Sequence, residues 1–290
     1  MDISIIICSF NRCTSLANTI ESICKMAVRS YIEWELIIVD NNSTDNTQDV
    51  VASFVSKGNK NIRYIFEKKQ GGSYAKNRGI SEAKGQIIAF TDDDVIVDNN
   101  WLMAIYLILN KEDNIGMVCG RTLPLNKNNY NLSTKTSNIA EIFKYPSSPW
   151  DMGNGNNIAI KKNTIGRVGL FDVRFGPGAP LKGSEDIDYL YRVIRSGFSV
   201  LYSPDPLVFH NHSSSNDVQY RSVKFSYAIA RGAFYSKYIL ARDIYVLKLL
   251  YWEVLNYISV ISCHNFNTIF TELRGLLIGA GLMLKYKGQI

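Results

Sequence analysis

Cysteine is scarce in this chain, and its cysteines do not form pairs in the sequence. The 290 residues contain five of them, at Cys8, Cys13, Cys24, Cys119 and Cys263, without a Cys-X-X-Cys motif. An odd and scattered set gives neither a disulfide framework nor the spacing of a zinc site. We therefore expect a reducing environment, of which the cytoplasm is the simplest.

A secretory leader and a membrane-spanning run are also missing from the pattern. The N-terminus enters an apolar strand at Ile3 without a basic region or a small-residue cleavage site, so we expect no secretory signal. The most apolar stretches lie at 244–262 and 275–287, and charged residues interrupt or end both of them. A spanning helix needs about 20 mainly apolar residues, so we expect neither stretch to cross a bilayer.

Most of the chain has almost equal numbers of basic and acidic residues. Lys and Arg number 32 and Asp and Glu 26, but residues 217–290 alone hold nine basic and four acidic residues. The basic excess therefore belongs to this last part, where no run of Lys or Arg occurs, and we expect no nucleic-acid binding. The hydrophobic content of 46% and charged content of 20% are typical of a globular protein.

Apolar strands alternate with helices through the first half of the chain. Short β-branched runs predict the strands, and apolar residues at helical spacing predict the helices between them. Strands joined through helices form right-handed βαβ units, which give a mostly parallel sheet with helices on both faces. The predicted fold class is therefore a doubly wound α/β fold. The strands are expected at 3–7, 34–39, 62–66, 87–90 and 115–119.

Polar residues follow three of the expected strands at the point where each strand ends. They read CSFNR (Cys8–Arg12), VDNNSTDNT (Val39–Thr47) and TDDDV (Thr91–Val95). The carboxyl ends of parallel strands share one edge of a sheet, and doubly wound folds bind their ligands at that edge. We therefore expect the three polar clusters to meet in one site.

The three successive carboxylates Asp92–Asp94 repel one another, and a divalent cation among them would relieve this repulsion. Oxygen ligands suit Mg²⁺ or Mn²⁺. The alternative is a solvated turn whose acids precede the helix at Trp101, since helix N-termini favour acidic residues. The triplet alone does not separate these two interpretations, and its place at the shared sheet edge favours the metal.

Two further features are typical of a ligand site. Gly71 and Gly72 precede a helix, where a glycine turn can bring backbone N–H groups close to an anion. Glu185 and Asp186 fall in the first turn of a helix expected at 184–195, where the helix dipole keeps carboxylates ionised, as a catalytic base requires. Simple capping of that helix by acidic residues is the alternative.

Five segments of the chain, taken in order, resemble the motif series of family 2 glycosyltransferases with the GT-A fold. They read IIICSFNR, ELIIVDNNSTDNT, KKQGGSYAKNRGI, IIAFTDDDV and GSEDIDYLYRVIRSGFSVLYSPDPLVFHNH. Their order carries the resemblance, because each motif alone is weak. The resemblance implies an inverting transferase that uses a nucleotide-diphosphate sugar, with a UDP-sugar favoured, and Mn²⁺ or Mg²⁺.

The resemblance also implies roles for individual residues. Asp94 is expected to ligate the metal, and His210 to complete its shell, with His212 as the alternative. Asp186 is expected to be the catalytic base. The residues expected to contact or surround the donor are Ser9, Asn11, Asp40, Gly71, Gly72, Arg78, Asp92 and Asp93.

The long stretch between Thr122 and Asn157 is irregular, and in the resembled family the corresponding region shapes the acceptor side. Trp150 can stack on a sugar ring, and Asp151 can accept hydrogen bonds from sugar hydroxyls. Glu185 is a third candidate for acceptor contact. The alternative for Trp150 is packing beneath the loop. The implied acceptor is a glycan or a lipid-linked glycan.

The chain is expected to divide into a catalytic domain at 1–216 and a helical extension at 217–290. The extension combines aromatic-rich apolar helices with nine basic and four acidic residues, which suits the surface of an anionic bilayer. Packing of these helices against the catalytic domain, or in a dimer, is the alternative. The membrane interpretation places the protein at the inner, cytoplasmic face of the cell membrane.

Two other classes of function are considered. A nucleotidyltransferase would carry a glycine-rich turn with a basic residue after the first strand, and CSFNRCTS contains no glycine. A non-catalytic nucleotide-sugar-binding module could keep the same fold without activity. The presence of Asp94, Asp186 and His210 together argues against such a module.

Overall fold

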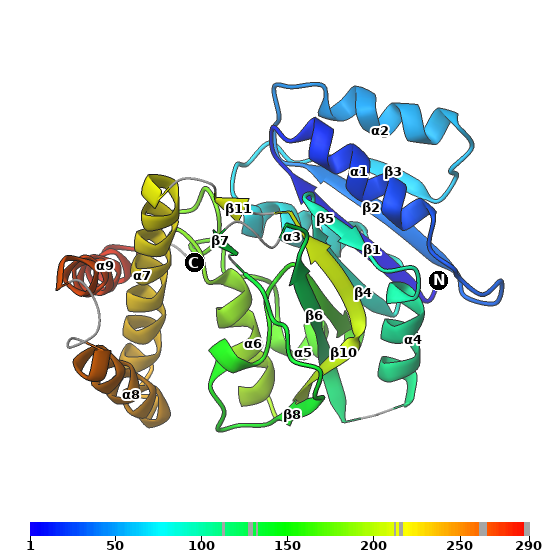
Figure 1. The fold of residues 1–290 in the computed structure, drawn as a ribbon. Helices are drawn as coiled ribbons and strands as arrows, with labels where there is room; N and C mark the ends of the chain where they lie inside the picture. Colours follow the sequence, from blue (N-terminus) through cyan, green and yellow to red (C-terminus); the bar gives the residue numbers. More distant parts are fainter. Residues whose placement is uncertain are drawn as a thin grey trace.

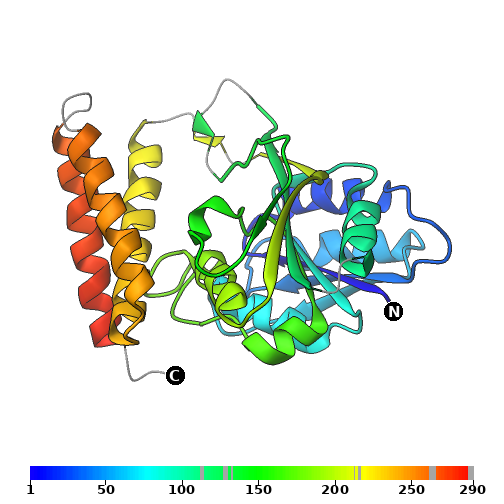
Figure 2. The same cartoon turned by 90° about the horizontal axis from the view of Figure 1, so that it is seen from below.

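Figure 1 shows the fold of the protein in a computed structural model, which describes residues 1–111, 114–126, 130–131, 133–211, 213–214, 217–260 and 266–286. A central sheet carries helices on both faces, and three C-terminal helices lie together at one side of it (Figures 1 and 2). His212, the alternative metal ligand, lies outside the described residues.

The central sheet has nine strands in the order β3-β2-β1-β4-β9-β6-β10-β5, with β8 paired to β10. Its strands are β1 (Ile3–Ser9), β2 (Trp34–Asp40), β3 (Ile62–Phe66), β4 (Ile87–Asp92), β5 (Val95–Val97), β6 (Ile115–Pro124), β8 (Glu141–Phe143), β9 (Asn157–Lys161) and β10 (Ser199–His210). The short strands β7 (Tyr130–Asn131) and β11 (Ser213–Ser214) form a separate pair. Neighbours β1, β2, β3 and β4 pair in parallel, and so do β6 and β10. The predicted mostly parallel α/β fold is confirmed.

The helices are α1 (Cys13–Cys24), α2 (Thr47–Ser56), α3 (Gly72–Glu82), α4 (Trp101–Lys111), α5 (Lys162–Val168), α6 (Glu185–Arg195), α7 (Asp217–Leu240), α8 (Ile244–Val260) and α9 (Phe266–Lys285), with a 3₁₀ turn at Pro149–Asp151. Buried residues of α1, α2 and α4 form one core cluster with the sheet. Residues of α3, α5 and α6 form the other cluster. The sheet therefore has an apolar layer on each face.

Alternation along β1 explains why this strand is buried on both faces. Ile3, Ile5 and Ile7 enter one core cluster, and Ile6 enters the other. Successive side chains of a strand point to opposite faces, so a run of isoleucines suits a strand that helices cover twice. Each fully buried isoleucine contributes roughly 1.5–3 kcal/mol to the stability of the fold.

Strand β9 is antiparallel and lies between β4 and β6 in the middle of the sheet. Ile158 and Ile160 enter the core cluster beneath α3 and α6, and Ala159 enters the opposite one. The sequence did not predict this strand, because it follows an irregular stretch and has only five residues. Its insertion leaves β4 and β6 pointing in the same direction.

The C-terminal helices pack against the part of the chain that forms the sheet. Phe234 of α7 lies with its ring centroid 4.8 Å from that of Trp150 and 5.3 Å from that of Tyr191. Lys237 of α7 forms ion pairs with Asp172 and with Asp188 of α6. Among the described residues, no helix is both long enough and apolar enough to span a membrane. Packing of α7 on the first 216 residues is thus observed, while α8 and α9 lie farther from the sheet (Figures 1 and 2).

Candidate active site

A cleft of about 570 Å³ lies at the carboxyl ends of β1, β4 and β10. Strand β1 ends at Ser9, β4 at Asp92 and β10 at His210, and all three residues line the cleft. The loop before α3 and the first turn of α6 complete its wall, through Gly71 and Asp186 among others. The expected polar clusters after β1 and β4 therefore meet in this cleft, whereas the cluster after β2 contributes Asn41 alone.

Asp92, Asp94 and His210 form a cluster with the donor set of a metal site. One ligand atom from each of them lies within 4.8 Å of the others. The Nε2 atom of His210 lies 3.2 Å from an oxygen of Asp94. The Arg12 guanidinium binds the other oxygen of Asp94 at 2.7 Å and also reaches Asp93 at 3.1 Å.

Two carboxyl groups at this edge, those of Asp92 and Asp93, have raised pKa values. Burial raises the pKa of Asp92 above its ordinary range, and the nearby Asp94 carboxylate raises it further. Burial likewise raises the pKa of Asp93 to about 6, although Arg12 and the Ser9 hydroxyl favour its ionised form. A carboxylate is deprotonated when it ligates a divalent cation, so a cation bound by Asp92 would oppose the raised pKa of that residue.

The cluster fits a hard divalent cation. Two carboxylates and an imidazole suit Mn²⁺ or Mg²⁺, and such ions leave further positions for water or phosphate oxygens. The ligand atoms of the three residues lie within 4.8 Å of one another, so these side chains could reach one such cation together.

Asp186 begins α6 and is held by two backbone N–H groups. Gly155 donates to one carboxylate oxygen at 2.7 Å, and Ile187 donates to the other at 2.8 Å. A side chain at position 155 would have its Cβ about 3.0 Å from Asp186, so the close approach requires glycine. Burial and the neighbouring Glu185 carboxylate raise the pKa of Asp186 to about 6, against the opposing effect of Lys76. Asp186 is therefore largely ionised at neutral pH.

Lys76 of α3 and Glu185 of α6 form a buried ion pair beside Asp186. Their charged atoms lie 2.6 Å apart, and both side chains are about 10% exposed. Burial lowers the pKa of Lys76, but Glu185 and Asp92 outweigh this effect and the net pKa is raised. The lysine is thus charged and holds positive charge within the acidic cleft. It also occupies an oxygen of Glu185, one of the residues expected to meet the acceptor.

The glycine turn before α3 adopts a conformation that other residues rarely reach. Gly71 has a φ of +135°, and its N–H donates to the side chain of Asn41 at 2.7 Å. The N–H of Gly72 donates to the carbonyl of Pro177 at 2.9 Å. Both glycines line the cleft, as expected of donor-side residues, and their N–H groups are engaged within the protein.

Three residues expected to contact the donor do not line the cleft. Asp40 accepts hydrogen bonds from the Tyr64 hydroxyl and the Ser43 N–H. Asn11 likewise binds the loop after β2, through Thr44. Arg78 lies on the exposed face of α3 and pairs with Glu82 at 2.9 Å.

Ser9, Asp92 and Asp93 do line the cleft, as expected. The Ser9 hydroxyl donates to Asp93 at 2.8 Å, so these two residues also support each other.

Of the two acceptor candidates in the irregular stretch, the cleft includes Trp150 but not Asp151. The Trp150 ring stacks on Tyr235 of α7 at 5.4 Å and meets Phe234 edge-on. Asp151 is exposed, and its backbone carbonyl accepts a hydrogen bond from Lys135. Trp150 therefore packs beneath α7 and also presents part of its surface to the cleft.

Several lining residues were not predicted from the sequence. Tyr227 and Arg231 reach the cleft from α7, and the Tyr227 hydroxyl lies 3.2 Å from that of Ser133. Arg231 binds Glu253 of α8 at 3.2 Å and Glu272 of α9 at 3.0 Å. No local motif signals these residues, because tertiary packing alone brings α7 to the cleft.

Lys76 could have been found from helical spacing. Gly72, Ala75, Lys76 and Gly79 recur at the spacing of one helix face, and all but Gly72 are fully or nearly fully buried. Residues three and four apart share a face. The same spacing puts Arg78 on the opposite, exposed face.

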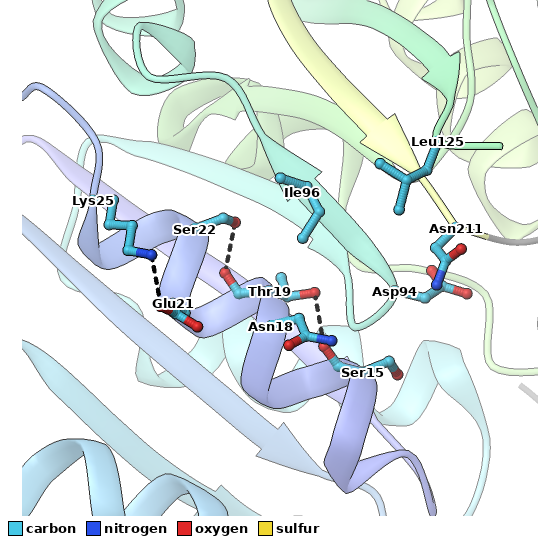
Figure 3. A pocket seen from close by; sticks show the side chains of 10 residues that line it. All are labelled: Ser15, Asn18, Thr19, Glu21, Ser22, Lys25, Asp94, Ile96, Leu125 and Asn211. Atoms are coloured by element: carbon cyan, nitrogen blue, oxygen red, sulfur yellow. Dashed lines mark hydrogen bonds and ion pairs between the residues drawn. The ribbon is translucent and has the colours of Figure 1, made fainter.

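Asp94 also borders a second pocket of about 280 Å³, between α1 and β5 (Figure 3). The hydroxyls of Thr19 and Ser22 on α1 accept hydrogen bonds from the N–H groups of Val95 and Val97, each at 3.2 Å. These bonds fasten β5 to α1. They therefore fix the turn that carries Asp94 into the cleft.

Comparison with known proteins gives a family and several structural relatives. The model of the family described as "Glycosyl transferase family 2" matches residues 4–172. A chondroitin synthase of Escherichia coli is 26% identical over 230 residues, which cover 67% of this chain and 32% of the relative. The chain spans 53% and 36% of the lengths of two other curated glycosyltransferase relatives. The residues that the family model matches include Asp92–Asp94 and end before Asp186 and His210.

Two solved structures support the fold assignment. The mannosyltransferase PcManGT from Pyrobaculum calidifontis, in complex with GDP-Man and Mn²⁺, matches with a TM-score of 0.65 at 15% identity, covering 97% of this chain and 86% of that one. TarS 1-349 of S. aureus in complex with UDP-GlcNAc matches with a TM-score of 0.60 at 15% identity, covering 80% and 66%. At these identities the likeness extends to the fold, which is that of GT-A glycosyltransferases.

Proposed function

Because the chain belongs to glycosyl transferase family 2, we propose that it transfers a sugar from a nucleotide-diphosphate sugar to a hydroxyl group of a glycan or lipid-linked glycan, with inversion at the anomeric carbon. One observation carries this proposal: the cluster of Asp92, Asp94 and His210 shares a single cleft with Asp186. A UDP-sugar is favoured, with a GDP-sugar as the nearest alternative, since the two structural relatives bind one of each.

Asp94 and His210, together with Asp92, would hold Mn²⁺ or Mg²⁺ at the donor side of the cleft. When bound, the ion supplies positive charge that stabilises the diphosphate leaving group. Arg12 pairs with Asp93 and Asp94 at the same edge and adds a further positive charge there. Ser9 and the Gly71–Gly72 turn border this side, where the donor is proposed to lie. Asp93 borders the same side, and Asn11, Asp40 and Arg78, the other donor residues expected from the resemblance, lie outside this cleft.

Asp186 is the proposed base. Its carboxylate accepts the proton of the acceptor hydroxyl while that oxygen attacks the anomeric carbon. The bond from this carbon to the diphosphate oxygen breaks on the opposite face, and the nucleoside diphosphate leaves with the bonding electrons. A single displacement of this kind inverts the anomeric centre. Gly155 and Ile187 hold both carboxylate oxygens and so fix the orientation of the base.

The acceptor is proposed to enter between the irregular stretch and α7. Tyr227, Arg231 and Trp150 line that side of the cleft, and aromatic rings with a guanidinium suit a sugar ring and its hydroxyls. Asp151 and Glu185 complete the proposed acceptor set.

The proposed architecture is a catalytic domain at 1–216 with a helical extension at 217–290. Because α7 supplies Tyr227 and Arg231 to the cleft, the extension takes part in the site. A lipid-linked acceptor would bring the protein to the cytoplasmic face of the cell membrane. Peripheral membrane contact through the C-terminal helices belongs to the same proposal.

The test compares the wild type with Asp186→Asn on a panel of UDP-, GDP-, CDP- and dTDP-sugars. With Mn²⁺ and an extract of membrane glycolipids, we expect the wild type to release nucleoside diphosphate from one class of donor. Asp186→Asn is expected to lower this rate by roughly 10²–10⁴-fold, because the base is lost, while metal-dependent nucleotide binding remains.

Asp49→Asn is the matched control, since Asp49 is exposed on α2 and outside the cleft. Transfer by Asp186→Asn at the wild-type rate would show that another group is the base. Donor binding without any release by the wild type would favour the non-catalytic module.

A further inference from the structure

The outer helices of the extension expose an unusual number of large apolar side chains. Ile244 is 80% exposed, Leu277 is 76% exposed and Trp252 is 58% exposed. The exposed apolar residues are Ile244, Leu247, Tyr251, Trp252 and Val254 on α8, and Phe270, Leu273, Leu277 and Leu284 on α9. Exposed apolar groups gathered on neighbouring elements indicate an interaction surface.

The apolar residues follow helical spacing on each helix. On α8 they recur at 244, 247, 251 and 252, and on α9 at 270, 273, 277 and 284. Intervals of three, four and seven residues place side chains on one face of a helix. Another face of each helix is used within the protein, since Val246 of α8 and Leu276 and Met283 of α9 are buried in the core cluster. Each helix is therefore apolar on both its inner and its outer side.

Acidic groups are turned inward from these helices. After Arg242 the sequence contains three acidic residues, Asp243, Glu253 and Glu272. Asp243 is buried and accepts a hydrogen bond from the Tyr191 hydroxyl at 2.8 Å. Glu253 and Glu272 both pair with Arg231 of α7, at the inner side of the extension.

Basic groups, in contrast, point outward. Arg242, Lys248, Arg274 and Lys285 are exposed. Three of them directly follow an exposed leucine, in the pairs Leu247–Lys248, Leu273–Arg274 and Leu284–Lys285. The packing of the extension has therefore separated its charges, so that the outer side is apolar and cationic while the acids lie beneath it.

We infer that the outer sides of α8 and α9, called here the α8–α9 surface, dock on the headgroups of an anionic lipid bilayer. Leucine and aromatic side chains insert at the headgroup boundary, and the interleaved Lys and Arg meet anionic lipids. A second copy of the chain fits less well, because two such surfaces would bring like charges together. This inference deepens the membrane contact of the proposed function by naming its residues and the lipid class.

Co-sedimentation with vesicles tests the inference without a substrate. The full chain is mixed with vesicles of phosphatidylcholine alone, or of phosphatidylcholine with about 30 mol % phosphatidylglycerol. We expect the protein to sediment with the anionic vesicles and not with the neutral ones. The triple variant Leu247→Ser, Trp252→Ser and Leu277→Ser is expected to lose binding by at least about tenfold.

The charge variant Lys248→Glu with Arg274→Glu is expected to weaken binding by more than about 25-fold, since each basic residue near an anionic surface contributes about fivefold. Leu107→Ser and Lys60→Glu serve as matched controls, because both residues are exposed in the catalytic half. These controls are expected to bind like the wild type.

Three results would overturn the inference. They are the absence of sedimentation with anionic vesicles, equal sedimentation of the charge variant, and a dimer by light scattering that the triple variant dissociates. Metal-dependent nucleotide binding, measured on every variant, reports the proposed function separately. A variant that still binds nucleotide but no longer binds anionic vesicles supports the inference. If the wild type binds vesicles but no nucleotide, the inference holds and the proposed function is wrong.

Discussion

Asp186 lies in a cleft that removes it from bulk water and gives both its oxygens a backbone N–H donor. Burial raises the pKa of this carboxyl, and Glu185 raises it further, whereas Lys76 and the two N–H groups favour the ionised form. The balance leaves a pKa of about 6. A carboxylate with such a pKa is ionised at neutral pH and accepts a proton more readily than an ordinary aspartate.

This balance predicts an acid limb in the pH dependence of the reaction. With saturating Mn²⁺, which keeps the metal ligands ionised, we expect kcat/KM to fall as the pH falls through about 6. Below that pH the Asp186 carboxyl is protonated and cannot accept the hydroxyl proton. Release of nucleoside diphosphate between about pH 5 and pH 8 gives the profile. A rate that is constant across this range would remove Asp186 from the base role.

At the scale of elements, α3 presents two cationic side chains to different surroundings. Lys76 faces the cleft and pairs with the buried Glu185, whereas Arg78 faces solvent and pairs with Glu82. They are two positions apart in the chain, which rotates the second side chain to the other face of the helix. The positive charge of Lys76 therefore serves the cleft, whereas that of Arg78 belongs to an ion pair at the surface.

We expect substitutions on the two faces of α3 to change the free energy of unfolding by different amounts. We expect Lys76→Met to lower the free energy of unfolding by about 3–5 kcal/mol, because Glu185 is left buried without its cation. Arg78→Met is the control and is expected to change it by less than about 1 kcal/mol, since its ion pair is exposed. Urea unfolding monitored by circular dichroism measures both. Equal effects of the two substitutions would contradict the assignment of faces.

Local sequence was enough for the parts of the site that end a strand or begin a helix. Asp92 and Asp94 follow an apolar run that pattern alone identifies, and Asp186 lies in the first turn of an amphipathic helix. Strand β9 and the cleft residues Tyr227 and Arg231 were not predicted. Their positions depend on contacts between segments far apart in the chain, which no local pattern records. Arg78 was expected at the donor through its place in the resembled motif, and the structure places it on the exposed face of α3.

At the scale of the whole molecule, α7 connects the C-terminal helices to the part of the chain that forms the sheet. Lys237 bridges Asp172 and Asp188, and Arg174 supports Asp172 from the same side. Burial alone would raise the pKa of Asp172, but Arg174 and Lys237 outweigh it and hold this pKa well below its usual range. A depressed carboxyl pKa stabilises the fold above the unfolded value of about 4, and this stabilisation is lost as the pH falls below it.

We therefore expect Lys237→Met to lower the free energy of unfolding by about 3 kcal/mol at neutral pH, because two buried carboxylates lose their shared cation. The difference from the wild type should shrink as the pH falls below about 4, because the stabilisation that comes from the depressed pKa of Asp172 is then progressively lost. Chemical unfolding at several pH values measures it, with the exposed Lys248→Met as control. A loss that does not depend on pH would mean that Lys237 acts through packing and not through charge.

The central claim is that a divalent cation held by Asp94 and His210 binds a nucleotide in the cleft. Thermal unfolding of the wild type and of Asp94→Asn, with UDP, GDP, CDP or dTDP and with or without Mn²⁺, tests it most directly. A ligand at about 100 times its dissociation constant adds roughly 2.7 kcal/mol of stability. We predict that one diphosphate stabilises the wild type only with Mn²⁺, and that Asp94→Asn loses this effect. A wild type that no diphosphate stabilises with the metal, or a variant stabilised equally well, would contradict the account.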